Sequence, residues 1–134
     1  MYVVIAGGGK VGWNLARELI GKGHEVTLLE NNRRRYLTIE EELEHAVQYG
    51  DASELWVLER AGIEQAQVFI ASTNGDNTNL VVSQIAQRRF KVPRVIARVL
   101  DPRRAAWYRE QGLQTICPTQ IAIEQLEKAA LEDL

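Results

Sequence analysis

Short apolar runs alternate with longer amphipathic stretches along the whole chain. The run Tyr2–Ala6 is almost entirely apolar, which is typical of a strand buried on both faces of a sheet. In the stretch that follows it, apolar side chains recur at the spacing of a helix. The same reasoning predicts five further strands, and the six expected strands lie at 2–6, 25–29, 46–49, 68–71, 95–99 and 113–117.

An amphipathic helix is expected after each of these strands. Glycine and proline positions help to bound these helices, which we expect at 11–22, 33–45, 53–61, 77–90, 102–111 and from residue 118 onward. Ser53 is expected to cap the third helix, and Asp101 followed by Pro102 to begin the fifth. Parallel strands with right-handed crossovers follow from this alternation. The sequence therefore predicts a single α/β domain, residues 1–134, with a Rossmann-like, doubly wound, six-stranded parallel sheet.

Composition narrows the class of protein further. Hydrophobic residues make up 46% of the 134 residues and the net charge is only -2, which excludes disorder as the main state. No apolar run approaches the ~18 residues of a membrane span, and no secretory signal precedes the first strand. The lone cysteine, Cys117, favours a reducing compartment. A pI of about 5.7 argues against a general nucleic-acid binder.

The residues directly after the first expected strand fit the pattern G-x-G-x-x-G. The pattern joins a strand to a helix here, as dinucleotide-binding folds require. Gly7 permits the tight turn, Gly9 lets the backbone approach a pyrophosphate, and Gly12 lets the helix pack close to the strand. The helix N-terminus offers N–H groups to phosphates, and Lys10 is placed to reach one. A P-loop is excluded because Val11, rather than Ser or Thr, follows the lysine.

An acidic residue follows the second expected strand. Glu30 lies close to the spacing of about 20 residues at which these folds place the carboxylate that binds ribose. A carboxylate there accepts hydrogen bonds from both ribose hydroxyls and repels a 2′-phosphate, so NAD is favoured over NADP. The arginines at 33–35 keep NADP open, although a solvated helix start explains them as well.

Polar residues also follow the third and fourth expected strands. Asp51, followed by Ala52, is placed to bind an adenine amino group, and a turn with a helix cap is the alternative. The run 72–79 consists of short polar residues at an edge where such loops line the ligand crevice. Arg98 lies in the apolar fifth strand, where a charge is costly unless it is paired. A phosphate or a carboxylate is the expected partner.

Catalytic and metal-binding patterns are missing from the sequence. His24, His45 and Cys117 do not have the spacing of a metal site, and no Tyr-x-x-x-Lys pair or nucleophile elbow occurs. A dehydrogenase also needs a substrate-binding region and a proton donor beside the nicotinamide. We therefore expect no catalytic residue, no bound metal and no enzymatic activity. An NAD-dependent oxidoreductase remains the alternative function, and a methyltransferase is a weaker one.

Six motifs follow one another along the chain. They are Gly7 to Gly12; Gly23-His24-Glu25-Val26 leading to Glu30; Gly50-Asp51-Ala52; Ala71-Ser72-Thr73-Asn74 with Asn79; Ile96-Ala97-Arg98-Val99 with Asp101-Pro102; and Gly112 leading to Cys117-Pro118. Together they resemble the N-terminal domain of regulators of potassium conductance (RCK), also called the TrkA-N or KTN domain. The resemblance covers almost the whole chain and is far more specific than one glycine loop.

The resemblance implies a regulatory domain that binds NAD(H), ATP, ADP or AMP and controls potassium transport through a membrane channel or transporter. It also implies a homodimer that assembles into rings, and a cytoplasmic protein that meets the inner face of the plasma membrane only through its transporter partner. Nucleotide-binding positions are expected at Gly7, Gly8, Gly9, Lys10, Val11, Gly12, Glu30, Asp51, Ala52, Thr73, Asn74, Asn79 and Arg98.

Three positions depart from the family pattern. Glu30 stands where Asp is usual, and Lys10 where several members carry Arg or Gln. Thr119 stands where some members carry an acidic residue, which weakens the case for a divalent cation. A ligand-binding domain often follows in the family, so the chain is expected to be a stand-alone domain or part of a longer protein. The last helix, 118–134, is expected at an oligomer interface because no strand follows to cover its apolar stripe.

Overall fold

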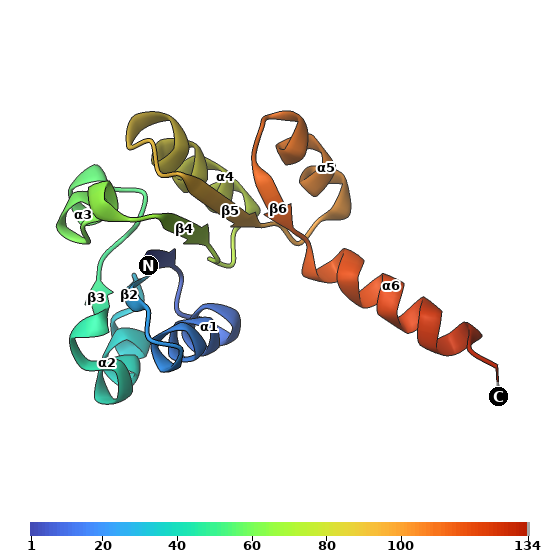
Figure 1. Ribbon diagram of the computed structural model, residues 1–134, viewed down its shortest axis with the longest axis horizontal. Helices are drawn as coiled ribbons and strands as arrows, with labels where there is room; N and C mark the ends of the chain where they lie inside the picture. Colours follow the sequence, from blue (N-terminus) through green and yellow to red (C-terminus); the bar gives the residue numbers. More distant parts are fainter. Residues whose placement is uncertain (134) are drawn as a thin grey trace.

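The computed structural model describes residues 1–133 and contains one parallel sheet flanked by helices (Figure 1). The strands are β1 (Tyr2–Ala6), β2 (Glu25–Glu30), β3 (Val47–Tyr49), β4 (Val68–Ala71), β5 (Arg94–Arg98) and β6 (Gln114–Ile116). The helices are α1 (Lys10–Gly21), α2 (Arg33–Leu43), α3 (Leu55–Arg60), α4 (Asp76–Gln84), α5 (Pro102–Glu110) and α6 (Pro118–Leu131). The predicted fold class and all six strands are confirmed.

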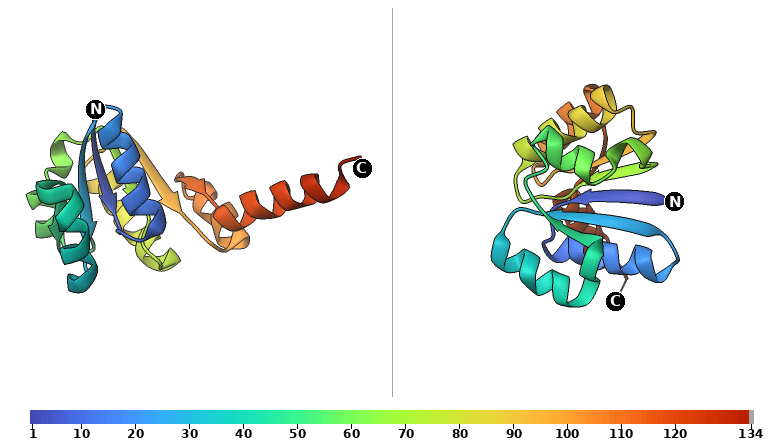
Figure 2. Two further views of the ribbon diagram at one scale, coloured as in Figure 1. Left: turned by 90° about the horizontal axis from the view of Figure 1, so that it is seen from below. Right: turned by 90° about the vertical axis from the view of Figure 1, so that its left-hand side faces the viewer.

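The sheet order is β3-β2-β1-β4-β5-β6, and every neighbouring pair is parallel. Helices α1 and α2 cover one face, and α3, α4 and α5 cover the other (Figure 2). The chain therefore leaves β1 and β4 in opposite directions, which makes the point between them the topological switch point. Ligands of open α/β sheets bind in the crevice that forms there.

Each face of the sheet has its own apolar core. Ile5 and Leu28 pack with Ile39 of α2 on one side, and Phe69 packs with Val82 of α4 on the other. All five side chains are fully buried. Side chains of one strand reach both cores because they alternate between the two faces of the sheet, which explains why the sequence shows continuous apolar runs rather than alternation.

Several predicted helix boundaries differ in the structure, including the end of α6, which is at Leu131. Ser53 does not cap α3, because that helix begins at Leu55 with Glu54 at the N-cap. Two expected helices change their hydrogen-bond pattern before they end: α2 is followed by a 3₁₀ turn at Glu44–Ala46, and α4 by a π-helical turn at Ile85–Arg89. Tertiary packing decides such terminal turns, and periodicity in the sequence does not report them.

Helix α6 is unlike the other helices because it leaves the domain as an arm (Figures 1 and 2). None of its residues from Pro118 to Leu131 is buried. Among the 133 residues that the structure describes, no helix is long and apolar enough to cross a membrane. The last residue of the predicted helix, 134, lies outside the described part of the chain.

Candidate functional site

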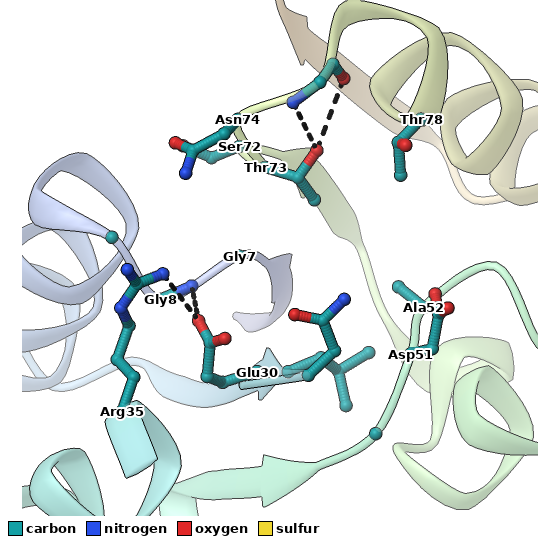
Figure 3. A pocket seen from close by; sticks show the side chains of 15 residues that line it. Gly7, Gly8, Glu30, Arg35, Asp51, Ala52, Ser72, Thr73, Asn74 and Thr78 are labelled. Atoms are coloured by element: carbon teal, nitrogen blue, oxygen red, sulfur yellow. Dashed lines mark hydrogen bonds and ion pairs between the residues drawn. The ribbon is translucent and has the colours of Figure 1, made fainter. Parts of the chain in front are cut away.

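A cavity of about 250 Å³ lies at the carboxyl ends of the strands, at the switch point between β1 and β4. Four segments surround it: the glycine loop after β1, the end of β2, the turn after β3 and the loop after β4 (Figure 3). The lining residues are Gly7, Gly8, Gly9, Leu29, Glu30, Asn31, Arg35, Gly50, Asp51, Ala52, Ser72, Thr73, Asn74, Gly75 and Thr78.

Glycine is required in the loop after β1 by backbone geometry. Gly7 has φ +106°, a conformation that side-chain-bearing residues rarely adopt. A Cβ atom on Gly12 would lie 1.8 Å from the carbonyl oxygen of Gly7, so only glycine lets α1 pack this close to β1. Around Gly9 no atom lies within 4 Å of such a Cβ, which leaves the space in front of the helix N-terminus open. Free N–H groups of a helix N-terminus suit an anion at this point.

Glu30 ties the glycine loop to the end of β2. Its side chain is buried, and its Oε1 accepts a hydrogen bond from the backbone N–H of Gly8 at 2.9 Å. The other oxygen, Oε2, accepts from the N–H of Asn32 at 2.7 Å. Arg35 lies beside the carboxylate, with Nη1 3.6 Å from Oε1 (Figure 3). Each carboxylate oxygen can accept more than one hydrogen bond, so Glu30 keeps acceptor capacity for a ligand.

The loop after β4 is held from behind by two side chains. Asn79 Oδ1 accepts hydrogen bonds from the N–H and the hydroxyl of Thr73 at 2.9 and 2.7 Å. Its Nδ2 donates to the carbonyl oxygens of Thr73 and Arg98 at 3.1 and 2.9 Å. Arg98 Nη2 donates to the Thr73 carbonyl oxygen at 2.6 Å. Among the described residues Arg98 therefore contacts a backbone carbonyl rather than the phosphate or carboxylate that the sequence suggested, and its buried Nε has no hydrogen-bond partner.

The turn after β3 closes the far end of the cavity. Asp51 Oδ1 accepts hydrogen bonds from the N–H and hydroxyl of Ser53 at 2.9 and 2.7 Å. These contacts match the turn that the sequence left open as an alternative for Asp51. Asp51 also lines the cavity, and its second oxygen, Oδ2, has no hydrogen bond within the described chain. The residue can therefore form the turn and face a ligand at once.

Of the expected nucleotide-binding positions, eight line this cavity: Gly7, Gly8, Gly9, Glu30, Asp51, Ala52, Thr73 and Asn74. Five do not: Lys10, Val11, Gly12, Asn79 and Arg98. Gly12 lets α1 pack close to β1. Asn79 and Arg98 form hydrogen bonds with Thr73, which itself lines the cavity. Lys10 is an exposed side chain at the first position of α1, next to the opening.

Sequence reasoning missed the lining residue Asn31, which directly follows the acidic residue. It belongs to no motif, so only the expectation that loops at this edge face the ligand could have found it. Thr78, in the first turn of α4, lies within the run 72–79 that the sequence indicated, and it lines the cavity. Arg35 was considered for its charge, and the structure places it in the wall of the cavity. Among residues 1–133, no group of three or more His, Cys, Asp or Glu side chains is arranged to hold a metal ion.

The sheet order, the glycine turn and the buried acid at the end of β2 define a Rossmann-like α/β domain of the dinucleotide-fold class. Residues 3–119 match the model of the family described as the TrkA-N domain. The chain belongs to this family, as the resemblance predicted.

Several relatives carry the names of potassium uptake proteins. The chain is 41% identical over 129 residues to the "Trk system potassium uptake protein TrkA homolog" of Methanothermobacter thermautotrophicus, which covers 96% of this chain and 59% of that protein. It is 44% identical over 103 residues to the "Trk system potassium uptake protein TrkA" of Mycobacterium tuberculosis, which covers 77% of this chain and 46% of that protein. The chain therefore spans about half the length of these relatives.

Solved structures share the fold. The TrkA-N domain of the inner membrane protein ybaL from Escherichia coli has a TM-score of 0.85 at 20% identity, over 98% of this chain and 96% of that one. The Kef CTD of Shewanella denitrificans, in AMP-bound form, has a TM-score of 0.82 at 25% identity, over 98% and 80% of the two chains. The GsuK structure described as bound to ADP has a TM-score of 0.79 at 24% identity, over 94% and 32%.

Proposed function

We propose that this chain is a regulatory domain that binds an adenine nucleotide and thereby controls potassium transport through a membrane channel or transporter. One observation carries the nucleotide-binding part. Glu30 is buried against the N–H of Gly8 at the switch point, so a carboxylate for ribose and a helix N-terminus for phosphate face one cavity. Both groups lie where this class of fold binds the ribose and the phosphates of a nucleotide.

The cavity suggests one orientation of the nucleotide. The phosphates lie in front of Gly9, where there is open space and the N-terminus of α1, and Lys10 supplies positive charge from the rim. The ribose hydroxyls donate to Glu30. The adenine lies toward Asp51 and Ala52, where the free Oδ2 can accept from its amino group. Asn79 and Arg98 contribute by holding the loop at Thr73 in place.

The candidate nucleotides are NAD(H), ATP, ADP and AMP. Three solved structures that share the fold are described as bound to AMP, ADP and NAD respectively. The transport role rests on the relatives whose printed names are potassium uptake proteins. The chain spans about half the length of those relatives. The transporter partner and the regulated activity are therefore proposed for the complex in which this domain works, and not for the domain alone.

We also propose a homodimer that uses α6. Four large apolar side chains on this arm, Ile121, Ile123, Leu126 and Leu131, are between 48% and 76% exposed. Four large exposed apolar side chains on one helix with no buried residue are unusual on a monomer. A second copy presents the same surface, so the two arms can cover each other in a symmetric interface. Dimers of this kind are the proposed building unit of a ring at the cytoplasmic face of a membrane transporter.

The proposal is tested with wild-type protein and the Gly9→Trp variant. A Cβ atom at position 9 would have nothing within 4 Å, so a tryptophan side chain is expected to extend into the space proposed for the phosphates. Isothermal titration calorimetry of the wild type with AMP and with NAD is expected to show saturable 1:1 binding. The variant is expected to lose both signals and to keep the thermal unfolding midpoint of the wild type.

Two results would contradict the proposal. The first is binding that is unchanged in Gly9→Trp, because the nucleotide then occupies another place. The second is sustained oxidation of NADH with a small metabolite that Gly9→Trp abolishes, because the chain is then an NAD-dependent oxidoreductase rather than a regulatory domain.

A further inference from the structure

We propose that the connection between α4 and β5 binds the anionic headgroups of a lipid bilayer directly, at the surface and without insertion. This segment, residues 88–94, carries Arg88, Arg89, Lys91 and Arg94, and we call it the basic turn. The inference goes beyond the proposed function, because it concerns a surface outside the nucleotide cavity and a partner other than a transport protein.

Charge is distributed unevenly along this chain. Residues 77–100 contain five basic residues and no Asp or Glu, although the whole chain has a net charge of -2. Four of the five lie within the seven residues of the basic turn. The low pI of the chain therefore conceals a local positive patch. The field of such a patch acts over about one Debye length, roughly 8 Å at physiological salt.

The basic side chains of this turn are available to a partner. Arg88, Arg89, Lys91 and Arg94 are all exposed. None of the ion pairs in the described part of the chain involves them. Arg89 lies over the ring of Phe90, with its guanidinium carbon 5.7 Å from the ring centroid, and this contact leaves its charge in place.

Buried residues hold the basic turn in one conformation. Val92 lies in the apolar core, and its N–H donates to the carbonyl oxygen of the buried Ala86 at 3.1 Å. The N–H of Arg94 donates to the carbonyl oxygen of Gln67 at 3.2 Å. The charges are therefore presented on a fixed backbone, which lowers the entropic cost of binding relative to a flexible tail.

Lys91 has a backbone conformation that favours glycine. Its φ is +57°, in the left-handed region, where a side-chain-bearing residue is strained and glycine is not. The lysine side chain is thus present where the fold alone favours its removal. Strained positions of this kind cluster at functional sites. A charge that contributes to binding rather than to folding explains the residue.

The shape of the basic turn favours a planar partner over a peptide. Peptides dock into grooves or add a strand to a sheet edge. No residue of the basic turn lines the nucleotide cavity or either of two further cavities in the described chain. β5 is not an edge strand either, because it pairs with β4 and β6. Anionic headgroups instead form an extended surface that attracts exposed Lys and Arg side chains.

The position of the basic turn agrees with this partner. Arg94 is the first residue of β5, so the turn lies at the amino ends of the parallel strands. The nucleotide cavity lies at the carboxyl ends. Figure 1 shows the connection between α4 and β5 on the side of the domain away from α6. A bilayer at the basic turn therefore covers neither the cavity nor the arm.

The test measures co-sedimentation of the whole chain with vesicles. Wild-type protein is expected to bind vesicles of phosphatidylcholine and phosphatidylglycerol in equal parts, to ignore vesicles of pure phosphatidylcholine, and to dissociate as salt rises. Each basic side chain contributes about fivefold to the partition coefficient, which corresponds to about 1 kcal/mol. Arg88→Gln combined with Arg89→Gln is therefore expected to lower the coefficient about 25-fold, and Lys91→Gly about fivefold. Lys91→Gly is also expected to unfold at the wild-type temperature or above, which separates lost binding from lost folding.

The matched control combines Arg34→Gln with Arg103→Gln. It removes two exposed arginines at the starts of α2 and α5, at the opposite edge of the sheet, and is expected to bind mixed vesicles as the wild type does. Equal losses in the two double variants, or wild-type protein that binds no mixed vesicles, would overturn the inference. Binding to poly-glutamate that depends on Arg88 and Arg89, without vesicle binding, would overturn it in favour of an acidic protein partner. Titration with AMP is independent of these results and tests the proposed function alone.

Discussion

At the scale of single residues, the buried carboxylate of Glu30 has two tasks. It accepts hydrogen bonds from the N–H groups of Gly8 and Asn32, which fixes the glycine loop against β2. It also lines the cavity, and each of its oxygens can accept a further hydrogen bond. The sequence predicted the second task from spacing alone. The first task was invisible in the sequence, because it depends on where two backbone N–H groups point after folding.

Glu30→Ala is expected to weaken AMP or NAD binding by roughly tenfold or more. The variant removes a charge-assisted hydrogen bond to the ribose, which is worth about 1.5–3 kcal/mol. It also leaves the N–H of Gly8 without its acceptor, so the free energy of unfolding is expected to fall by about 1–3 kcal/mol. Calorimetric titration and urea unfolding measure the two effects. Glu30→Gln, which keeps one acceptor oxygen, is expected to recover part of the affinity and part of the stability. Wild-type affinity in Glu30→Ala would show that Glu30 does not contact the nucleotide.

Arg35 is expected to set how strongly the site rejects a 2′-phosphate. Wild-type protein is expected to prefer NAD over NADP because Glu30 repels the extra phosphate. Arg35 lines the cavity beside Glu30 and offsets part of that repulsion. Arg35→Ala is therefore expected to widen the preference for NAD by about threefold, within the range of exposed charge pairs.

The matched control is Arg34→Ala, a neighbouring exposed arginine that does not line the cavity. Titration with both dinucleotides is expected to give the wild-type ratio for this control. Equal affinity for NAD and NADP in the wild type would show that the arginines dominate over Glu30. The same widening in both variants would show a general charge effect instead of a local one.

At the scale of elements, the strands were predicted well because continuous apolar runs and their glycine and proline boundaries are local signals. The end of the fourth helix was predicted less well. The sequence predicted one regular helix to residue 90, whereas the structure has a π-helical turn at Ile85–Arg89, which tertiary packing decides. Ser53 was wrongly expected to cap α3 because its N–H and hydroxyl both donate to Asp51. The sequence Asp51-Ala52-Ser53 is compatible both with this turn and with a helix cap at Ser53, and the sequence alone does not show which of the two forms.

Gly12→Ala is expected to destabilise the fold strongly. The added methyl would lie 1.8 Å from the Gly7 carbonyl oxygen, so α1 must move away from β1. Overpacking of this kind typically costs about 1–3 kcal/mol, and this contact places the change at or above the upper end. Gly21→Ala, at the end of the same helix with nothing within 4 Å, is the matched control and is expected to be near neutral. Similar midpoints for both variants in thermal unfolding would contradict the packing argument.

At the scale of the whole molecule, α6 is the element whose position the domain alone does not explain. Its apolar residues were visible in the sequence, and its projection from the domain was not, because periodicity cannot distinguish a core from an interface. The candidate site shows the same limit. Its glycine loop and acid followed from motifs, whereas the hydrogen bonds by which Arg98 and Asn79 hold the loop at Thr73 are seen only in the folded structure.

Leu126→Lys is expected to dissociate the proposed dimer. Leu126 is 70% exposed on the arm, and a charge there cannot be buried against a second apolar arm. Light scattering after size-exclusion chromatography is expected to give a dimer for the wild type and a monomer for the variant at micromolar concentration. Gln125→Lys, an adjacent exposed change of similar charge, is the control and is expected to weaken association less. A monomeric wild-type protein at high micromolar concentration would contradict the proposed dimer.

The central claim is that an adenine nucleotide occupies the cavity at the switch point, and a crystal structure of the protein with AMP tests it most directly. The account predicts electron density with the phosphate in front of Gly9, the ribose hydroxyls within hydrogen-bond distance of Glu30, and the adenine beside Asp51. Density for AMP at any other place, or an empty cavity in crystals grown at saturating AMP, would contradict it.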